Sequence, residues 1–462
     1  MTKLDEVAAW IADRLPDLLA EHQVPAAGWA VLADGAVVDG AAGLLSTVTG
    51  VSATPQSLFQ IGSITKVWTA TLVMQLVAEG RLGLQDRVAE HLPGFALADA
   101  DAAATLTVRQ LLSHTAGFEG DVFTDTGRGD DCLERYVGTL GDVDQLFAPG
   151  ERFSYNNAGY CVLGRLVEVL RGAPFDDCLR EHLIDPLGLT SAATSPYEAV
   201  LHRVAVGHVR PAPDAAEVPA PVWAMARSNA PAGSMLAMSA RDLLTFARMH
   251  LAGGTADDGA VVLADDAVAA MQERQVQLPD LRVMGDAWGL GWELFDSMGT
   301  PVIGHDGNTI GQASFLRVLP EQGVAVVLLT NGGDPYGLYQ AVVGHVLREL
   351  AGVELRPMPV PPADPPPVDP ARYAGTYGSR VADLVVSADD DGRVWLEIRP
   401  KGDAVEMGEL PERSELVSFA PDTLIQVQSQ SGLHMPFAFL GDDGAGHARF
   451  LHIGRAVPRV AR

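Results

Sequence analysis

The sequence predicts an α+β domain over residues 1–355, followed by a small all-β domain over residues 371–462. Two observations carry this prediction. Strand and helix patterns are mixed in the first part, whereas the last part contains short alternating strands separated by Asp-Gly and other Gly-rich turns. Between them, residues 356–370 are so rich in proline that we expect a stiff, extended linker. The late strand patterns lie at residues 382–387, 393–399, 424–429, 437–440 and 449–453.

The chain opens with a pattern typical of an amphipathic helix, with acidic residues near its start, over residues 1–12. A secretory signal would instead place positive charges before an apolar stretch and a cleavage site. No stretch of the sequence is long and apolar enough to predict a membrane span. We therefore expect a cytoplasmic protein that does not associate with membranes.

Ser63 and Lys66 form an S-x-x-K motif at the start of a predicted helix over residues 63–79. Gly62 allows a tight turn into this helix, and Gly80 is placed to end it. Positions i and i+3 share one helix face, so the amine lies within reach of a hydroxyl at the positive end of the helix dipole. Taken alone, the motif is more often a helix cap followed by a solvated lysine.

Two further motifs follow along the chain. Tyr155 and Asn157 form a Tyr-x-Asn motif just before a helical pattern, and His305 and Gly307 form a His-x-Gly motif before two apolar strand patterns. Each motif by itself is common in loops and turns. The three together, in this order, form a much more specific pattern than any one of them.

The three motifs resemble the active-site set of the serine β-lactamase and penicillin-binding-protein superfamily, specifically its class C-like branch. Residues 106–118 and 231–236 also look like segments that this family carries between its motifs, and the resemblance covers about residues 5–350. It implies an antiparallel sheet made from both ends of the catalytic region and flanked by helices, beside a helical region that holds Tyr155. His114 lies in a segment that is structural in this family, so we assign it no catalytic role.

The resemblance also implies the chemistry of the first two motifs. Ser63 attacks an acyl carbonyl, and neutral Lys66 takes its proton. For this, burial and the nearby helix dipole must lower the lysine pKa from its usual value of about 10.4. Tyr155 then relays protons between the serine, the leaving group and the incoming nucleophile. Asn157 hydrogen-bonds Lys66 and the substrate amide.

The third motif supplies the oxyanion hole and discriminates between substrates. The backbone N–H groups of Ser63 and Asn308, next to Gly307, are expected to hold the oxyanion. Many β-lactamases and transpeptidases have Lys-Thr-Gly here, which holds a substrate carboxylate, whereas this chain has His305 and Asp306. A neutral imidazole and a carboxylate bind a second carboxylate poorly, which disfavours β-lactamase and D-alanyl-D-alanine carboxypeptidase activity. We expect His305 to hydrogen-bond Tyr155 or to assist proton transfer. For Asp306, a side chain that points outward and takes no part in the site is an equal alternative.

The His-Asp-Gly sequence, the expected cytoplasmic location and a C-terminal domain that resembles the lipocalin-like domain of several family members narrow the resemblance. The chain is most similar to standalone penicillin-binding-protein-type thioesterases, which release nonribosomal peptides. This implies that Ser63 takes a peptide with a C-terminal D-residue from a phosphopantetheinyl thioester on a peptidyl carrier protein. The peptide's own amine then closes a head-to-tail macrolactam.

Several alternatives stay open at this stage. A cytoplasmic esterase or D-aminopeptidase would use the same residues to hydrolyse its substrate, and an inactive family member would serve as a binding module. Arg455 is a candidate to bind a peptide carbonyl in the cleft, and a surface position is its alternative. The C-terminal domain either supports the fold or shapes the substrate cleft.

Composition excludes other classes of function. With 32 Lys and Arg against 59 Asp and Glu, the net charge of −27 repels nucleic acid and anionic membranes. Cys132, Cys161 and Cys178 are odd in number and form no metal-binding or disulfide pattern. We therefore expect neither a metal ion nor another cofactor.

Overall fold

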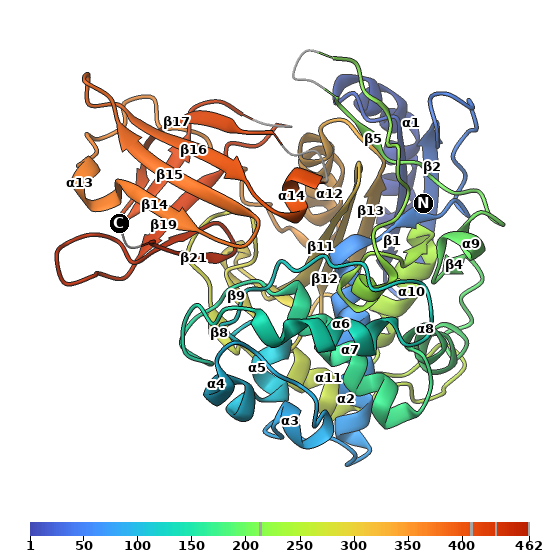
Figure 1. Cartoon of the computed structure of the whole chain (residues 1–462). Coiled ribbons are helices and arrows are strands. Elements are labelled where there is room, and N and C mark those ends of the chain that lie inside the picture. Colours follow the sequence, from blue (N-terminus) through green and yellow to red (C-terminus); the bar gives the residue numbers. More distant parts are fainter. Residues whose placement is uncertain (212–214, 407–409, 430–431, 461–462) are drawn as a thin grey trace.

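The computed structural model describes the whole chain of 462 residues except residues 212–214, 407–409, 430–431 and 461–462 (Figure 1). The last three of these stretches fall in the predicted all-β domain, so the prediction for them lies outside the described residues. A region of mixed helices and strands extends to helix α12 (Pro335–Ala351), and a region dominated by strands follows it. The predicted α+β class with an additional all-β domain is confirmed.

The central sheet of the first region is antiparallel, and both ends of this region contribute to it. Strand β1 pairs with β13 from Ala27↔Thr330 to Leu32↔Ala325, so the earliest and latest parts of the region lie side by side. The eight strands follow the order β2 (Ala36–Gly43), β1 (Ala26–Ala33), β13 (Val324–Thr330), β12 (Gln312–Leu319), β11 (Val302–Thr309), β10 (Glu293–Phe295), β9 (Ala287–Trp288) and β8 (Val276–Gln277).

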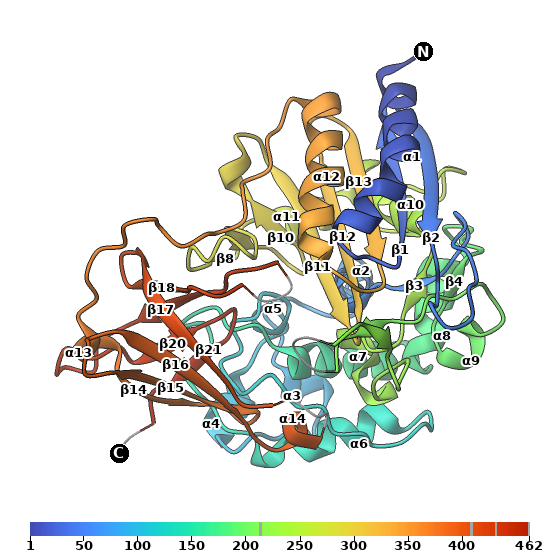
Figure 2. The same ribbon diagram turned by 90° about the horizontal axis from the view of Figure 1, so that it is seen from above.

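Helices cover both faces of this sheet, which explains why its central strands are apolar runs rather than alternating patterns. Figure 2 shows α1 (Lys3–Glu21) and α12 side by side on one face. The predicted amphipathic start of the chain is therefore part of α1, whose buried stripe includes Val7, Ile11 and Leu15. Helices α2 (Thr65–Ala78) and α10 (Ala240–Leu251) pack into the core on the other face.

Helix α2 passes through the centre of the molecule. Its residues from Thr65 to Leu76 are all buried, and apolar side chains surround it on every side. A helix that is apolar all round is typical of a protein core, and this one provides a rigid base for the residues at its start.

Short elements complete the first region. The α-helices are α3 (Val88–His91), α4 (Ala100–Thr105), α5 (Val108–Leu112), α6 (Cys132–Gly138), α7 (Asn157–Arg171), α8 (Phe175–Leu179), α9 (Pro196–Ala199) and α11 (Asp265–Gln272). The 3₁₀ helices are η1 (Gly62–Ile64), η2 (Thr139–Asp142), η4 (Arg227–Ala232) and η5 (Asp296–Met298), and η3 (Arg180–Ile184) is a π-helix. One small sheet has the strand order β3 (Phe59–Gln60), β7 (Ala237–Met238) and β4 (Ala192–Ala193). A second small sheet pairs β5 (His208–Val209) with β6 (Val218–Pro219).

Residues 352–369 run without helix or strand to the short helix α13 (Pro370–Tyr373). The all-β region then forms an up-and-down sheet in which each strand pairs with the next along the chain. A bridge between Tyr377 and Arg459 links its first and last strands, so the sheet nearly closes into a barrel. Its members are β14 (Gly375–Gly378), β15 (Ala382–Ala388), β16 (Val394–Pro400), β17 (Glu412–Ala420), β18 (Thr423–Gln426), β19 (Pro436–Leu440), β20 (Phe450–His452) and β21 (Ala456–Pro458), with α14 (Asp403–Glu406) after β16.

Five of these strands coincide with the predicted patterns, although β18 ends at Gln426 and not at residue 429. The sequence analysis did not identify β14, β17 or β21. β17 was missed because half-buried residues break its alternation over its last four positions. Among the described residues, no helix combines the length and the apolar character that a bilayer span requires.

Candidate active site

Ser63 lies in the turn η1, where the chain approaches strand β11. Gly62 has a φ of +52°, and a Cβ atom on it would lie 2.7 Å from the backbone nitrogen of Asn308. Only glycine permits both this conformation and this close approach. The predicted helix therefore begins later than expected: Ser63 belongs to a 3₁₀ turn, and α2 starts at Thr65. No side chain caps α2, so the serine is not a helix cap.

Lys66, in the first turn of α2, is fully buried and touches the serine. Its Nζ atom lies 3.1 Å from Ser63 Oγ and 2.6 Å from the carbonyl oxygen of Ala232. Burial lowers the pKa of Lys66 to about 7, and the positive charge of Arg455 acts in the same direction. The solvated lysine of the alternative interpretation is therefore excluded. A large fraction of this amine is neutral at physiological pH and able to accept a proton.

Tyr155 lies next to this pair, just before α7. The Lys66 ammonium nitrogen is 4.7 Å from the centre of the tyrosine ring. Burial raises the pKa of Tyr155, and the nearby Ser63 side chain partly opposes this rise, so the phenol carries its proton at neutral pH. His114 stacks on the ring at 4.4 Å, and its Nδ1 accepts the backbone N–H of Asn156 at 2.9 Å. His114 thus fixes the Tyr155 segment, in agreement with the structural role expected for it.

Asn157, the first residue of α7, contacts a different partner from the one expected. Its Nδ2 donates to Asp121 Oδ1 at 2.8 Å, whereas the predicted hydrogen bond to Lys66 is not formed among the described residues. The prediction did not include Asp121, which orients the Asn157 amide, or the Ala232 carbonyl, which accepts from Lys66 Nζ. Asn157 still lines the same cavity as Ser63.

Arg455 lies in the site, although it belongs to the C-terminal all-β region. Its guanidinium binds both oxygens of Asp121, at 2.9 and 3.2 Å, and lies 4.9 Å from the centre of the Tyr155 ring. The backbone supports this placement, because the N–H of Tyr155 donates to the carbonyl of Gly454 at 2.8 Å. Arg455 therefore lines the cavity with a side chain that stays 35% exposed, and it is not a surface residue away from the site.

The third motif lies on β11 and faces the same cavity. Nδ1 of His305 lies 2.6 Å from the carbonyl oxygen of Asp306, and burial lowers the pKa of His305 to about 3, so the imidazole is neutral. The expected hydrogen bond to Tyr155 is not formed: the ring centres are 6.4 Å apart, and neither Tyr155 Oη nor His305 Nε2 has a hydrogen-bond partner in the described part of the chain. Asp306 does not point outward either. Both of its oxygens accept hydrogen bonds from the buried Arg317, at 2.6 and 3.1 Å.

The backbone of β11 approaches the serine closely. A Cβ atom on Gly307 would lie 1.9 Å from the carbonyl oxygen of Ile61 and 3.1 Å from the backbone nitrogen of Ser63. The N–H groups of Ser63 and Asn308 therefore belong to neighbouring stretches of backbone. This placement suits the oxyanion hole expected from the motif.

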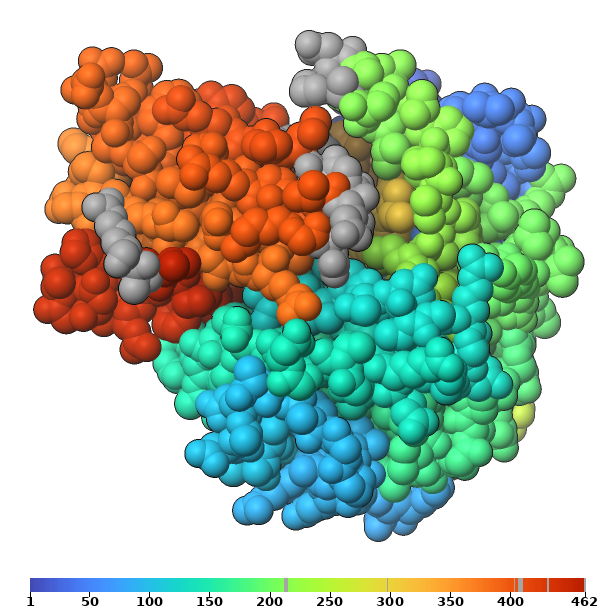
Figure 3. Space-filling view, in the orientation of Figure 1, coloured from blue at the N-terminus to red at the C-terminus, as the bar shows by residue number. Residues whose placement is uncertain are grey.

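A cavity of about 480 Å³ joins these residues. Figure 3 shows a hollow on this face of the molecule, between the orange surface of the all-β region and the green surface near residue 220. Residues of the all-β region form part of its wall, and most of the other wall residues are apolar. Besides the motif residues, the wall contains Phe123, Met225, Asn229, Ala232, Gly233, Ser234, Val283, Met284, Glu293, Thr309, Ile310, Tyr336, Leu433, Met435, Ile453 and Arg455.

Sequence reasoning missed several of these residues. Asp121 and Arg317 make the polar contacts described here, and Glu293 Oε1 lies 3.7 Å from His305 Nδ1, yet all three residues lie outside the motifs. Asp121 closely follows the family-like segment 106–118, which is the only local signal pointing to it. Glu293 and Arg317 lie on strands whose pairing, rather than whose sequence pattern, brings them to the site.

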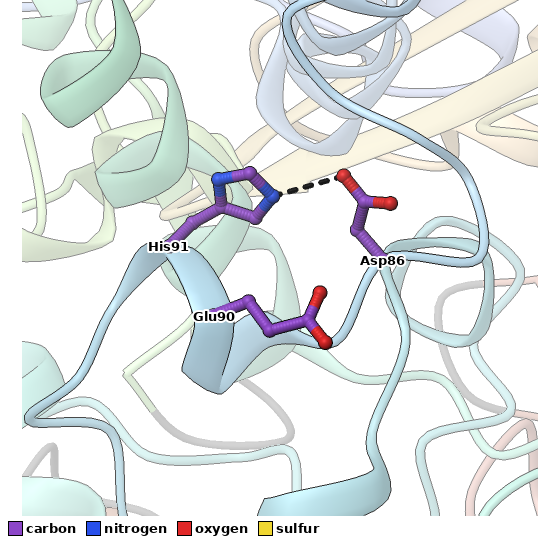
Figure 4. Close-up of side chains that lie close together, drawn as sticks. All are labelled: Asp86, Glu90 and His91. Carbon is purple, nitrogen blue, oxygen red and sulfur yellow. Dashed lines mark hydrogen bonds and ion pairs between the residues drawn. The ribbon is translucent and has the colours of Figure 1, made fainter.

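A separate cluster contains Asp86, Glu90 and His91, whose possible ligand atoms lie within 4.8 Å of one another (Figure 4). His91 Nε2 lies 2.9 Å from Asp86 Oδ2, which also accepts the backbone N–H of Gly83 at 2.7 Å. Glu90 accepts the N–H of Arg87 at the start of α3. These contacts hold the turn before α3, and we assign the cluster a structural role.

Comparison with known proteins agrees with this geometry. The family model described as Beta-lactamase matches residues 11–347. Penicillin-binding protein 4 of Amycolatopsis lactamdurans is 48% identical over 367 residues, covering 79% of this chain and 96% of the relative. The crystal structure of SurE superposes with a TM-score of 0.77 and 32% identity, covering 99% of this chain and 100% of SurE.

A more distant structure, the D-amino acid amidase from Ochrobactrum anthropi, shares the fold with a TM-score of 0.63 and 23% identity, covering 76% of this chain and 99% of the amidase. The full-length match with SurE agrees with the predicted resemblance to standalone penicillin-binding-protein-type thioesterases. The chain therefore belongs to the β-lactamase family, in the superfamily of serine enzymes that its Ser63, Tyr155 and His305 motifs predicted.

Proposed function

We propose that this protein is a serine acyltransferase that releases a peptide from a carrier-protein thioester by head-to-tail macrolactam formation. Ser63 Oγ attacks the thioester carbonyl while its proton passes to neutral Lys66. The backbone N–H groups of Ser63 and Asn308 stabilise the oxyanion, and the carrier's thiol leaves with a proton relayed by Tyr155. The peptide's amine then attacks the Ser63 ester, so that an amide bond forms and the serine is regenerated.

The observation that carries the acyl-transfer step is the buried contact of 3.1 Å between Lys66 Nζ and Ser63 Oγ. Burial supplies what a lysine base needs, because it lowers the lysine pKa to about 7. With an ordinary pKa of about 10.4, fewer than about one lysine in a thousand would be neutral at pH 7.

The wall of the cavity supports a peptide as the acyl group. Leu433, Met435 and Ile453 of the all-β region join apolar residues of the first region around the nucleophile. Such a covered, apolar site shields an ester from water and favours a tethered amine as the nucleophile. The superposition on SurE in a crystal structure with D-Leu, at 31% identity and a TM-score of 0.75, supports a D-residue at the acylating end.

Charge at the third motif argues against a substrate with a free carboxylate there. The two arginines nearest the motif tyrosine and histidine are each paired: Arg317 with Asp306, and Arg455 with Asp121. An additional carboxylate would compete with these partners for the guanidinium groups. These two ion pairs add to the effect of neutral His305 and the Asp306 carboxylate, which already disfavoured such a substrate.

The test gives purified protein a peptidyl thioester with a C-terminal D-residue and separates cyclic from linear product by mass. The matched control is the same peptide with an L-residue at that position. We expect mainly cyclic product from the D-peptide and slower thiol release from the L-peptide. Only linear product from several D-peptides would make the protein a hydrolase, and absence of acylation by thioesters and esters would make it a binding module.

The acyl donor in this proposal is a peptidyl carrier protein in the cytoplasm. The chain carries a net charge of −27, and carrier proteins are often acidic, so docking needs local basic or apolar contacts and should respond to salt. A higher kcat/KM for a carrier-bound peptide than for a small thioester of the same peptide would support docking. Equal values for both substrates would contradict it.

The Amycolatopsis relative favours a second candidate activity, because it is called a penicillin-binding protein. A β-lactam ring is an acyl donor, and the same serine would open it to form an ester. Intact-protein mass after incubation with penicillin tests this activity. An adduct on the wild type that is absent from the Ser63→Ala variant would support it, and no adduct would exclude it.

A further inference from the structure

The cavity contains a buried carboxyl group that the acylation step does not use. Glu293, on β10, lines the same cavity as Ser63 and is only 3% exposed. Its Oε2 atom has no hydrogen-bond partner in the described part of the chain. A buried carboxyl oxygen without a partner costs free energy, because no hydrogen bond replaces the ones that it made to water. A ligand that donates a hydrogen bond there would recover that loss.

The neighbours of Glu293 leave this oxygen free. Arg317, the nearest cation, is held by both oxygens of Asp306. Burial raises the pKa of Glu293 to about 8, and the charge of Asp306 adds to this rise, whereas the charge of Arg317 and the backbone N–H groups of Asp306 and Gly285 partly oppose it. The titratable and charged groups that face Glu293 among the described residues include Tyr155 before α7, His305 and Asp306 of β11, Arg317 of β12, and Tyr336 and Tyr339 of α12.

Two further acceptors without partners line the same cavity. His305 Nδ1 lies 3.7 Å from Glu293 Oε1 and 2.6 Å from the carbonyl oxygen of the next residue, to which it donates. In the neutral ring, Nε2 therefore carries a lone pair, and this buried atom has no partner among the described residues. The same holds for the hydroxyl oxygen of Tyr155. The unpartnered oxygens of Asn229 and Thr309 also line the cavity, but of these four groups only His305 and Tyr155 contact Glu293 or interact with it electrostatically in the described part of the chain.

We propose that Glu293 binds the free α-amino group at the far end of the Ser63-bound peptide, with His305 Nε2 and Tyr155 Oη as its other acceptors. A primary ammonium carries three N–H donors, and its positive charge favours the ionised form of the Glu293 carboxyl, which then accepts one donor beside two neutral acceptors. The proposal rests on the acyl transfer proposed above and names the site that receives the nucleophile. An N-terminally blocked peptide lacks the charge and the donors that this site recognises.

The site also prepares the amine for attack. The ammonium proton passes to the Glu293 carboxylate, and the neutral nitrogen bonds to the acyl carbon while the bond from that carbon to Ser63 Oγ breaks. Of the two protons left on nitrogen, one passes to Ser63 Oγ through Lys66 and the other stays on the new amide, and Glu293 releases its proton to solvent as the product leaves. Burial raises the pKa of Glu293 toward that of an α-amino group, about 7.7–8.0, and this rise favours the first transfer.

A binding experiment tests the site without depending on cyclisation. The probe is a peptide alcohol, which cannot acylate the serine, used with a free or an acetylated N-terminus. Each is measured as an inhibitor of thiol release from a small acyl thioester. For the wild type at pH 8 we expect the free amine to inhibit at least about 10-fold more tightly than its acetylated twin. In the Glu293→Gln variant we expect this preference to fall below about 2-fold.

Controls separate a lost site from a misfolded protein. Glu168→Gln changes another buried glutamate, which pairs with Arg165 and does not line the cavity, and it should keep the preference. The Glu293→Gln variant must still form a Ser63 adduct in a mass measurement, which shows that it is folded. The Glu293→Asp variant keeps a carboxyl group and should restore part of the preference for the free amine. A wild type without the preference, or a folded Glu293→Gln variant that keeps it, would overturn the proposal. Linear product only, with the preference intact, would overturn the cyclase proposal alone and leave the amine site standing.

Discussion

At the scale of single residues, the decisive feature is the environment of Lys66. The sequence predicted that this lysine must be buried to act as a base, and the structure places its ammonium group between Ser63 and a backbone carbonyl. The sequence could not show that Arg455, nearly 400 residues later in the chain, adds its charge to the same effect. Burial is a property of the packed molecule and not of a motif.

The pH dependence of acylation follows from this lysine. A pKa lowered to about 7 means that protonation removes the base as the pH falls through 7. We expect kcat/KM for a small thioester to be level above this pH and to fall about 10-fold per pH unit below it. Stopped-flow thiol release between pH 5 and 9 measures the profile. A profile that stays flat down to pH 5 would show that Lys66 is not the base.

At the scale of elements, the packing of η1 against β11 forms the site. The sequence analysis located the helix that becomes α2 and the strand patterns that become β12 and β13, because long apolar runs identify such elements reliably. It placed Ser63 inside the helix, however, since a short 3₁₀ turn has no sequence period of its own. It also missed Glu293, because β10 has only three residues and its role depends on its pairing with β11.

A methyl group on Gly307 should separate these two elements. The added Cβ atom would lie 1.9 Å from the Ile61 carbonyl oxygen, so the Gly307→Ala variant must move β11 away from Ser63. Loss of one oxyanion donor lowers acylation by about 10²–10³-fold, and we expect a decrease of this size. Gly138→Ala is the control, because nothing lies within 4 Å of the added atom and its backbone is helical. If Gly307→Ala acylates as fast as this control, β11 does not contribute to the oxyanion hole.

At the scale of the whole molecule, the all-β region is part of the active site. The proline-rich segment and the change in strand pattern predicted a second domain, but left open whether it is a support or a wall of the cleft. The all-β region has both roles. It supports the first region, because His452 Nε2 lies 3.2 Å from the carbonyl oxygen of Phe153, and it forms part of the wall of the cleft, because Ile453 lines the cavity. No local pattern in the sequence connects such distant segments, so this contact required the folded chain.

Removing the Arg455 side chain should test the contact between the two regions. The Arg455→Ala variant leaves Asp121 without its bidentate partner, and Asn157 then loses a fixed acceptor. Because the guanidinium is partly exposed, we expect a modest loss of stability and a decrease of about 10-fold or more in kcat/KM for peptidyl thioesters. The Arg455→Lys variant keeps the positive charge but cannot bind both oxygens of Asp121, so its kcat/KM should lie between those of the wild type and the alanine variant. Unchanged kinetics in the alanine variant would make the arginine a purely structural link.

The central claim is that Ser63 carries the acyl group, and mass spectrometry of the intact protein tests it most directly. Wild-type protein mixed with a peptidyl thioester and quenched in acid should gain the mass of the acyl group, and proteolysis should locate the added mass on the fragment that contains Ser63. The Ser63→Ala variant should show no adduct. An adduct on another residue, or the same adduct in the Ser63→Ala variant, would contradict the account.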